Sequence, residues 1–285
     1  MRVCVTGAAG FIGKHVVSLL RLRGHEVITL DSVGDVEIQA DITKPLPTIT
    51  ALDAVIHLAA ISHPRLCDED RSKAFDVNVN GTSNVLLMAL KSGAKKVVFS
   101  SSAHVYDLPP RYLPTDEVHP LRLGNTYTTT KLLGEQLCQL YFDNHGLSYT
   151  TLRLFNAFGP KQGRGFFIPD MVGRAKMGIV ELTGANTTKD WVFVSDVADA
   201  FAKSLESDFV GPINVGTGIE TSLGSILKHI IKATPRGAYF AVNSDYPTRM
   251  CADIKRAKRI LGWEPFISLE EGLRRTLQVA VGASV

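Results

Sequence analysis

Cysteine is scarce in this sequence. The 285-residue chain has four cysteines, widely separated, and none of them forms a CxxC pair. Cysteines spaced in this way argue against a zinc site and against a disulfide framework. We therefore expect no bound metal and reduced, mostly buried thiols, as is typical of a cytoplasmic protein.

Long hydrophobic runs are also missing. No stretch approaches the roughly 20 consecutive apolar residues that a membrane helix needs. Glycines, Lys14 and His15 interrupt the apolar residues near the N-terminus, so the sequence predicts no signal peptide. We expect a cytoplasmic protein with no membrane partner.

A strong excess of charge of either sign is the third absence. The chain has 31 Lys and Arg residues against 28 Asp and Glu residues, a formal net charge of +3. It shows no basic run and no alternation of basic with aromatic residues, which argues against nucleic acid as a partner. The small basic excess fits a solvated surface, or alternatively a local basic pocket for an anionic substrate.

Short β-branched runs alternate with longer segments of helical periodicity through the first half of the chain. The hydrophobic fraction of 45% is that of a globular protein with a substantial core. Alternating strands and helices predict an α/β fold, a doubly wound parallel sheet with helices on both faces. The expected strands are residues 3–6, 26–30, 54–58, 96–100 and 149–154, and the expected helices residues 15–22, 74–92 and 129–145.

After about residue 155 the pattern loosens into glycine- and asparagine-rich loops with shorter elements. We expect one domain over residues 1–155 and a smaller C-terminal region over residues 156–285 that meets it at a cleft. Some later elements are expected to interleave with the first domain, which makes the boundary soft. Helices are predicted near residues 168–177, 196–205, 222–232, 254–261 and 269–279.

The sequence VTGAAGFIG places Gly7, Gly10 and Gly13 between a predicted buried strand and a predicted helix. Gly7 allows a tight turn, Gly10 lets the backbone approach a phosphate, and Gly13 lets the helix pack on the strand. The helix N-terminus then presents free N–H groups and the positive end of its dipole to a pyrophosphate. The pattern predicts dinucleotide binding, with a plain strand-to-helix turn as the alternative.

Asp31 closes the second predicted strand, 21 residues after Gly10. A carboxylate at this separation is expected to hydrogen-bond the adenosine ribose and would repel a 2′-phosphate, which favours NAD over NADP. A helix N-cap is the alternative role for Asp31. With NAD as the expected cofactor, residues 1–155 are predicted to form an NAD-binding Rossmann domain and residues 156–285 a substrate-binding region.

Several motifs in order extend this pattern. The GxxGxxG spacing, preceded by Thr6, resembles the short-chain dehydrogenase/reductase superfamily. ADI at residues 40–42, HLAA at 57–60 and NVNGT at 78–82 resemble its extended branch, the nucleotide-sugar epimerase/dehydratase family, and the resemblance continues to about residue 280. It implies cofactor contacts from Gly7, Gly10, Phe11, Ile12, Gly13, Asp31, Asp41, Ile42, Leu58, Ala59, Ala60, Asn78, Ser100, Tyr127 and Lys131.

The sequence YTTTK places Tyr127 and Lys131 four positions apart, on one face of a predicted helix. Tyrosine has a reference pKa of about 10, but an ammonium group and a positive nicotinamide beside it favour the phenolate. We expect Tyr127 to take a proton from a sugar hydroxyl while hydride leaves the adjacent carbon, and Lys131 to hold the nicotinamide ribose. Ser102, at a predicted strand end, matches the family's catalytic serine, which hydrogen-bonds the reacting oxygen.

The two residues after Ser102 separate the reactions of the family. Dehydratase relatives resemble TDE here, an acid and a base that eliminate water, whereas this chain has Ala103 and His104. Elimination is therefore not expected. His104, a predicted substrate contact, is either a satisfied hydrogen-bonding histidine or a proton relay.

The resemblance also assigns substrate contacts to the C-terminal region. Asn156, in RLFNAFGP, is expected to contact a substrate phosphate. The family clamps the diphosphate with arginines, but this chain has Lys189 at one such position and Asn243 at the other. Lysine is a point charge and does not reproduce the bidentate arginine fork. Arg249 lies nearby in the sequence and is a candidate replacement.

Together these residues favour an NAD-dependent nucleotide-sugar 4-epimerase, with a UDP-sugar as the favoured substrate and a transient 4-keto sugar. A keto-sugar reductase or dehydrogenase that exchanges NAD(H) in each turnover is the rival. A non-catalytic dinucleotide-binding sensor is an alternative of another class. The resemblance implies a homodimer paired through the helices expected at residues 74–92 and 129–145.

Overall fold

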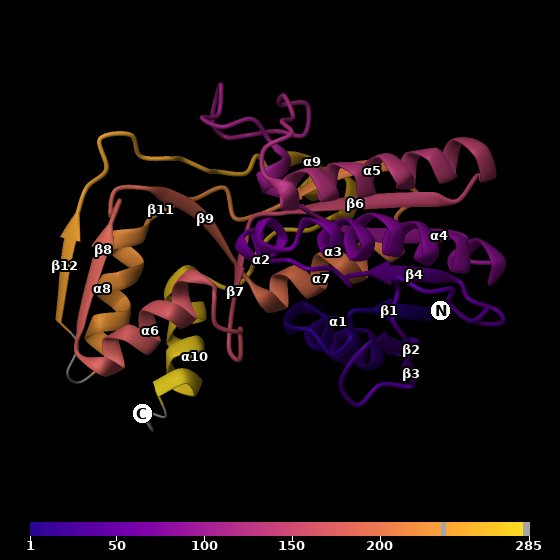
Figure 1. Cartoon of the computed structure of the whole chain (residues 1–285), viewed down its shortest axis with the longest axis horizontal. Helices are drawn as coiled ribbons and strands as arrows, with labels where there is room; N and C mark the ends of the chain where they lie inside the picture. Colours follow the sequence, from indigo (N-terminus) through magenta and orange to yellow (C-terminus); the bar gives the residue numbers. More distant parts are fainter. Residues whose placement is uncertain (235–237, 282–285) are drawn as a thin grey trace.

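The computed structural model describes residues 1–234 and 238–281, and its largest feature is a seven-stranded parallel sheet (Figure 1). The chain builds this sheet outward from β1 to β3 in one direction and from β4 to β10 in the other. The reversal between β1 and β4 confirms the doubly wound α/β fold predicted from the sequence. The spatial order of the strands is β10 (Gly211–Val215), β6 (Ser148–Leu154), β5 (Lys96–Ser102), β4 (Ala54–His57), β1 (Arg2–Thr6), β2 (Glu26–Asp31) and β3 (Ile38–Gln39).

Helices cover both faces of the large sheet. Successive strand residues point to opposite faces, so Val3 and Val5 join one core and Cys4 the other. One core is completed by α1 (Phe11–Leu22), α7 (Val194–Leu205) and α9 (Lys255–Leu261), and the other by α4 (Gly81–Lys91) and α5 (Thr126–His145).

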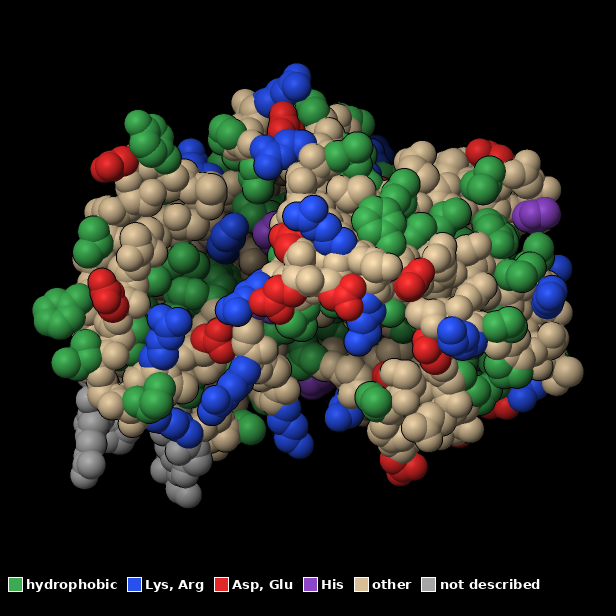
Figure 2. Space-filling model, viewed as in Figure 1, with side chains coloured by type: hydrophobic (Ala, Val, Ile, Leu, Met, Phe, Trp, Pro, Cys, Tyr) green, Lys and Arg blue, Asp and Glu red, His purple; other side chains and the backbone are tan. Residues whose placement is uncertain are grey.

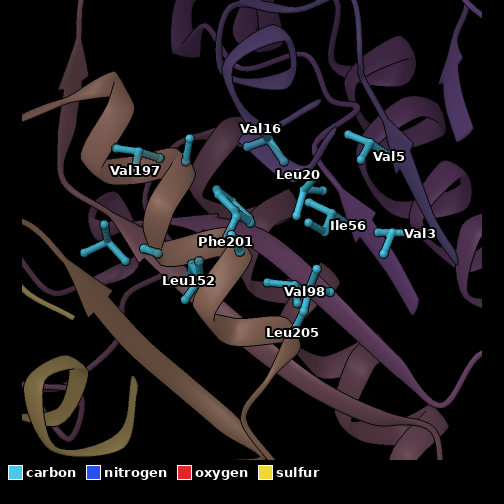
Figure 3. Packing of buried hydrophobic residues seen from close by; sticks show 14 of the residues in the cluster. Val3, Val5, Val16, Leu20, Ile56, Val98, Leu152, Val197, Phe201 and Leu205 are labelled. Atoms are coloured by element: carbon cyan, nitrogen blue, oxygen red, sulfur yellow. The ribbon is translucent and has the colours of Figure 1, made fainter. Parts of the chain in front are cut away.

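The first of these cores fixes α1 against the sheet. Leu20 of α1 and Phe201 of α7 are completely buried and lie beside Ile56, Val98 and Leu152 of the strands (Figure 3). Burial of each such side chain contributes about 1.5–3 kcal/mol. The start of α1, and with it the glycine-rich turn before it, is therefore held by a close-packed layer.

A smaller part lies at the other end of the molecule, on the left in Figure 1. Its core joins Ile168, Ile226 and Leu273 from the helices to Val180 and Phe193 from the strands. The elements are a sheet of β11 (Glu220–Ser222), β9 (Thr188–Phe193) and β7 (Asn156–Phe158), a pair of β12 (Ala238–Val242) and β8 (Ile179–Thr183), and helices α6 (Phe167–Met177), α8 (Leu223–Ala233) and α10 (Leu269–Val281).

Elements that follow residue 155 contribute to both parts. β10 pairs with β6 at the edge of the large sheet, where Ile213 lies opposite Leu152, and α7 packs on α1. This is the interleaving that the sequence led us to expect. The boundary at residue 155 itself stays a prediction.

The helix predicted over residues 74–92 is confirmed as a helical segment, but it contains a π-helical turn that the sequence did not predict. The chain forms α2 (Pro64–Glu69) and α3 (Arg71–Phe75), then a π-helical turn over Asp76–Asn80, and only then α4. A π turn inserts an extra residue into the helical ladder, which an analysis of 3.6-residue periodicity does not detect. Among the described residues, no helix combines the length and apolar character needed to cross a bilayer.

Candidate active site

A cavity of about 680 Å³ opens at the carboxyl ends of the central strands, where the strand order reverses. The surface is hollowed between the smaller part and the rest of the molecule (Figure 2). Asn78, Lys189 and Arg249 lie outside the cavity wall. The predicted site residues that line it are Gly7, Gly10, Phe11, Ile12, Gly13, Asp31, Asp41, Ile42, Leu58, Ala59, Ala60, Ser100, Ser102, His104, Tyr127, Lys131 and Asn156.

The turn that contains Gly7, Gly10 and Gly13 forms a concave backbone surface, here called the cradle, which larger side chains would fill. Gly7 has a φ of +69°, and a Cβ atom there would lie 2.6 Å from the backbone nitrogen of Ala59. A Cβ atom on Gly13 would lie 2.1 Å from the carbonyl oxygen of Gly7. Gly10 is the N-cap of α1 and offers no side chain to its first turn, which leaves those N–H groups free for an anion. The turn therefore fits the pyrophosphate of a dinucleotide.

Carboxylates mark the adenosine end of the cavity. Asp31 accepts hydrogen bonds from the backbone nitrogens of Ala9, at 3.0 Å, and Val33, at 3.3 Å. The residues directly after Asp31 read SVGDV and offer no cation to a 2′-phosphate. Asp41 lies at the same end, where a hydrogen bond from the backbone nitrogen of Thr43 lowers its pKa. These carboxylate acceptors fit the ribose hydroxyls of NAD and disfavour the 2′-phosphate of NADP.

His57 is hydrogen-bonded to Thr6, the residue that precedes the glycine-rich turn. Its Nε2 lies 3.0 Å from the hydroxyl of Thr82, and that hydroxyl donates its own hydrogen to the carbonyl of Asn78. His57 must therefore donate from Nε2 and accept at Nδ1 from the hydroxyl of Thr6, at 2.7 Å. Complete burial lowers the pKa of His57 to about 3, so it stays neutral and joins β1, β4 and α4.

The predicted acid/base residues meet at the opposite end of the cavity. The side chain of Asn125 caps α5 by accepting from the backbone nitrogen of Thr128, at 2.9 Å, which places Tyr127 in the first turn and Lys131 one turn later. Lys131 donates to the carbonyl of Ser100 at 2.9 Å, and its Nζ lies 6.0 Å from the centre of the Tyr127 ring.

Burial strongly perturbs this pair. It raises the pKa of Tyr127 to about 12, against a hydrogen bond from Ser102 that lowers it. It lowers the pKa of Lys131 to about 8. Ser102, Tyr127 and Lys131 are all buried. Desolvation favours the neutral form of each group, so a bound cation beside the phenol would strongly favour proton transfer from it.

Asn78 fixes the wall of the cavity from behind. Its amide oxygen accepts from the backbone nitrogen of Ile61 at 2.8 Å, and its Nδ2 donates to the carbonyl of the same residue at 3.1 Å. Nδ2 also donates to the hydroxyl of Thr130 at 3.0 Å. Asn78 thus ties the loop after β4 to the helix that carries Tyr127 and Lys131, a role that the sequence analysis missed.

His104 lies beside the reacting end. Its ring centre is 6.5 Å from that of Tyr127, and burial, followed by the nearby Lys189, lowers the pKa of His104 to about 4. The ring is therefore neutral at physiological pH. Asn156 lines the same region and donates to the carbonyl of Asp190 at 3.2 Å, which leaves its amide oxygen free of intramolecular partners in the described chain.

The altered diphosphate clamp is split in this structure. Lys189 is largely buried, its pKa is lowered by burial, and its amine lies 3.2 Å from the sulfur of Met250. Arg249 lies on the surface and forms a bidentate ion pair with Glu220, its Nε donating to Oε1 at 2.9 Å. The structure does not bring Arg249 together with Lys189 at the cavity.

An aromatic wall completes the cavity and was missed by the sequence analysis. The residues follow β6, lie at the start of α6 and come from β9, so they are scattered along the chain. The members of this wall are Phe155, Phe166, Phe167 and Trp191, and His63 lies beside them.

The sheet reversal, the glycine cradle and the buried Tyr–Lys–Ser set define a dinucleotide-binding enzyme of the short-chain dehydrogenase/reductase type. The NAD dependent epimerase/dehydratase family matches residues 3–216. The chain belongs to that family, and its cofactor is NAD.

Relatives match nearly the whole chain. A Methanocaldococcus jannaschii protein provisionally named UDP-glucose 4-epimerase is 34% identical, with 96% of this chain and 97% of the relative covered. UDP-glucuronic acid decarboxylase 6 of Arabidopsis thaliana is 31% identical over 96% of this chain and 87% of its own. The structure of UDP-glucose 4-epimerase from Thermotoga maritima with UDP-glucose is similar, with a TM-score of 0.88, 27% identity and 99% of both chains covered.

Proposed function

We propose that the protein is a nucleotide-sugar 4-epimerase, with a UDP-sugar as substrate. The observation that carries the proposal is the position of the carboxylates that line the cavity. In the described part of the chain, the acidic residues that line the cavity are Asp31 and Asp41, both at the adenosine end. The reacting end holds Ser102, Tyr127, Lys131 and a neutral His104, which suit proton transfer at a hydroxyl and lack an acid–base pair for elimination.

Each proton step takes place at the C4 oxygen of the sugar. Tyr127 as phenolate accepts the hydroxyl proton, and the hydroxyl of Ser102 donates a hydrogen bond to the same oxygen. Lys131 stabilises the phenolate and holds the nicotinamide ribose. When bound, NAD supplies a hydride acceptor that returns the hydride within the same turnover. Between loss and return of the hydride the 4-keto sugar rotates and presents its other face. The configuration at C4 is therefore inverted, and no net oxidation occurs.

The diphosphate is the partner that we propose for Lys189. A buried ammonium group is costly unless an anion compensates it. In the described structure the amine of Lys189 has a hydrogen bond to the Met250 sulfur and no ion pair with a carboxylate, so a substrate phosphate would supply the missing charge. Asn156 adds an amide at the cavity wall. Arg249 takes part only if it leaves Glu220, so we expect Arg249→Ala to change KM by less than Lys189→Ala does.

A homodimer paired through α4 and α5 is also part of the proposal. Leu87 on α4 and Leu140 on α5 are large apolar side chains, and they are 40% and 50% exposed. A second copy would cover them. Sedimentation at micromolar concentration tests this directly, and a monomer would contradict it.

The decisive experiment compares three reactions in one preparation. One portion of protein purified without added ligand is denatured, and the released NAD is counted per chain. Native portions of the same preparation are incubated with UDP-glucose, with UDP-glucuronic acid, and with a keto sugar plus NADH. Inversion at C4 without consumption of added cofactor supports the epimerase.

Two other outcomes would replace the proposal. Loss of CO₂ from UDP-glucuronic acid would favour a decarboxylase, the activity named for the Arabidopsis relative. Stoichiometric NADH consumption would favour the reductase. Tyr127→Phe should abolish whichever reaction occurs, with Tyr141→Phe on the same helix as the matched control. Bound NAD with none of the three reactions in the wild type would leave a non-catalytic sensor.

A further inference from the structure

Two loops that are distant in the sequence meet at the cavity. His63 ends the loop that follows β4, and Gly165 belongs to the loop between β7 and α6. The imidazole Nε2 of His63 lies 2.6 Å from the carbonyl oxygen of Gly165, across a separation of 102 residues. Both residues line the cavity. This contact joins the Rossmann part of the wall to the part contributed by later elements.

Both loops start beside the phosphate cradle. The first passes Ala59, whose backbone nitrogen would lie 2.6 Å from a Cβ atom on Gly7. The second starts at Gly159, where a Cβ atom would lie 3.4 Å from the ring of Phe11, the first residue of α1. The cradle, the two loops and the His63–Gly165 contact therefore form a closed ring. The cavity that would receive a dinucleotide is lined by the cradle and by both residues of this contact.

The Gly165 peptide is fixed from both sides. Its nitrogen donates to the carboxylate of Asp170, in the first turn of α6, at 2.8 Å, while its carbonyl accepts from His63. Gly165 has a φ of +94°, and a Cβ atom there would lie 3.1 Å from Cδ2 and Nε2 of the imidazole. Glycine is thus required both by the backbone conformation and by the close approach of the ring.

The His63 side is equally constrained. Pro64 starts α2 directly after it, and Asn78 holds both backbone polar groups of Ile61 two residues before it. The ring of Phe166 packs edge-on against the imidazole with centres 5.6 Å apart and an interplanar angle of 77°. The contact therefore forms between two segments that are each held by further contacts.

The tautomer of His63 follows from its partner. A carbonyl oxygen only accepts, so Nε2 carries the hydrogen. The other nitrogen, Nδ1, is buried without a partner in the described chain, and a proton there would be an unsatisfied donor. Nε2 of His63 is therefore the donor of the bridge and the carbonyl oxygen of Gly165 its acceptor.

We propose that the His63–Gly165 bridge is a clasp that keeps NAD in the protein between turnovers. The inference rests on the proposed function, because an epimerase regenerates its cofactor in place and gains from retaining it, whereas a reductase must open the wall in every cycle. The bridge controls the rate at which NAD leaves, while the cradle and the Tyr–Lys pair determine how it binds.

The test uses three substitutions of His63 in the full chain. His63→Phe keeps a ring against Phe166 but removes the donor, His63→Gln restores an N–H of similar reach, and His63→Ala removes both. His229→Phe, on α8 and outside the cavity wall, is the matched control. Each protein is loaded with labelled NAD, and the label is chased with excess unlabelled NAD without any sugar present.

Loss of this hydrogen bond predicts a rate of NAD release up to about tenfold faster in His63→Phe, faster still in His63→Ala, and within about threefold of wild type in His63→Gln. Wild-type release from His63→Phe and His63→Ala would overturn the clasp. The chase is independent of turnover. Faster NAD release from the variants, with no C4 inversion by the wild type, would support the clasp and reject the epimerase. C4 inversion by the wild type, with unchanged NAD release from the variants, would support the epimerase and reject the clasp. Thermal melting of each variant separates release from unfolding, and either His63→Phe or His63→Ala provides the test if the other fails to fold.

Discussion

Replacing Lys131 with methionine tests the electrostatics of the reacting end. Methionine keeps a long apolar side chain against Phe99, whose ring centre lies 5.2 Å from Nζ, and removes the charge. With the charge 6.0 Å from the centre of the Tyr127 ring and an effective dielectric constant of about 20, the lost Coulomb energy is about 3 kcal/mol. That energy corresponds to about two pKa units, or roughly a hundredfold in the phenolate population.

The direction of the pH dependence follows from the sign of the charge. An ammonium group favours the phenolate and so lowers the pKa of Tyr127; its removal raises that pKa. Lys131 has a pKa of about 8. Its ammonium charge therefore stabilises the Tyr127 phenolate fully below that pH, and this stabilisation is lost as the pH rises through about 8. Lys131→Met should therefore lose about a hundredfold in kcat at pH 7, and less at higher pH, where the wild type has lost the same charge.

The assay measures initial rates of C4 inversion of the accepted sugar from pH 6 to pH 10, at saturating NAD. Bound NAD is counted in each sample, because Lys131 is also expected to hold the ribose. Lys228→Met, an exposed position on α8, is the control. A Lys131→Met enzyme that is loaded with NAD and keeps the wild-type kcat and pH profile would refute the reasoning.

Three further substitutions probe the cradle and its supports. Gly13→Ala should abolish NAD binding by calorimetry, since its Cβ would lie 2.1 Å from a carbonyl oxygen, while Gly173→Ala, with no atom within 4 Å, should bind normally. Glu135→Gln should lower the free energy of unfolding in urea by about 3–5 kcal/mol, because it leaves the guanidinium of Arg153 buried and poorly compensated. Asp31→Asn should narrow the preference for NAD over NADP by roughly tenfold in titrations, since the repulsive charge is gone; an unchanged preference would contradict the role of Asp31.

Contiguous motifs made the fold and the cofactor cradle predictable. The turn from β1 into α1, and Tyr127 and Lys131 on α5, each lie within a few residues, so spacing alone determines their geometry. Strand and helix alternation similarly predicts the doubly wound sheet. Asn78 was the exception, since its motif suggested a cofactor contact, but the π turn over Asp76–Asn80 directs its amide to Ile61 and Thr130.

The rest of the site depends on contacts between distant segments, which spacing does not encode. His63 meets a carbonyl from the loop before α6, and Trp191 reaches the cavity from β9. The ion pair between Arg249 and Glu220 likewise depends on how the β10–β11 turn lies beside the segment before α9. Such pairings depend on the packing of the smaller part, where no motif marked them.

The return of the chain to the large sheet at β10 limits how the smaller part can be exchanged. Residues 156–210 leave the sheet after β6 and come back through α7, and β10 then closes the edge that β6 would otherwise expose. The smaller part is consequently joined to the large sheet by several crossings of the chain. Exchange of residues 156–285 as one contiguous module would also remove β10 and α7 from the large sheet and its core.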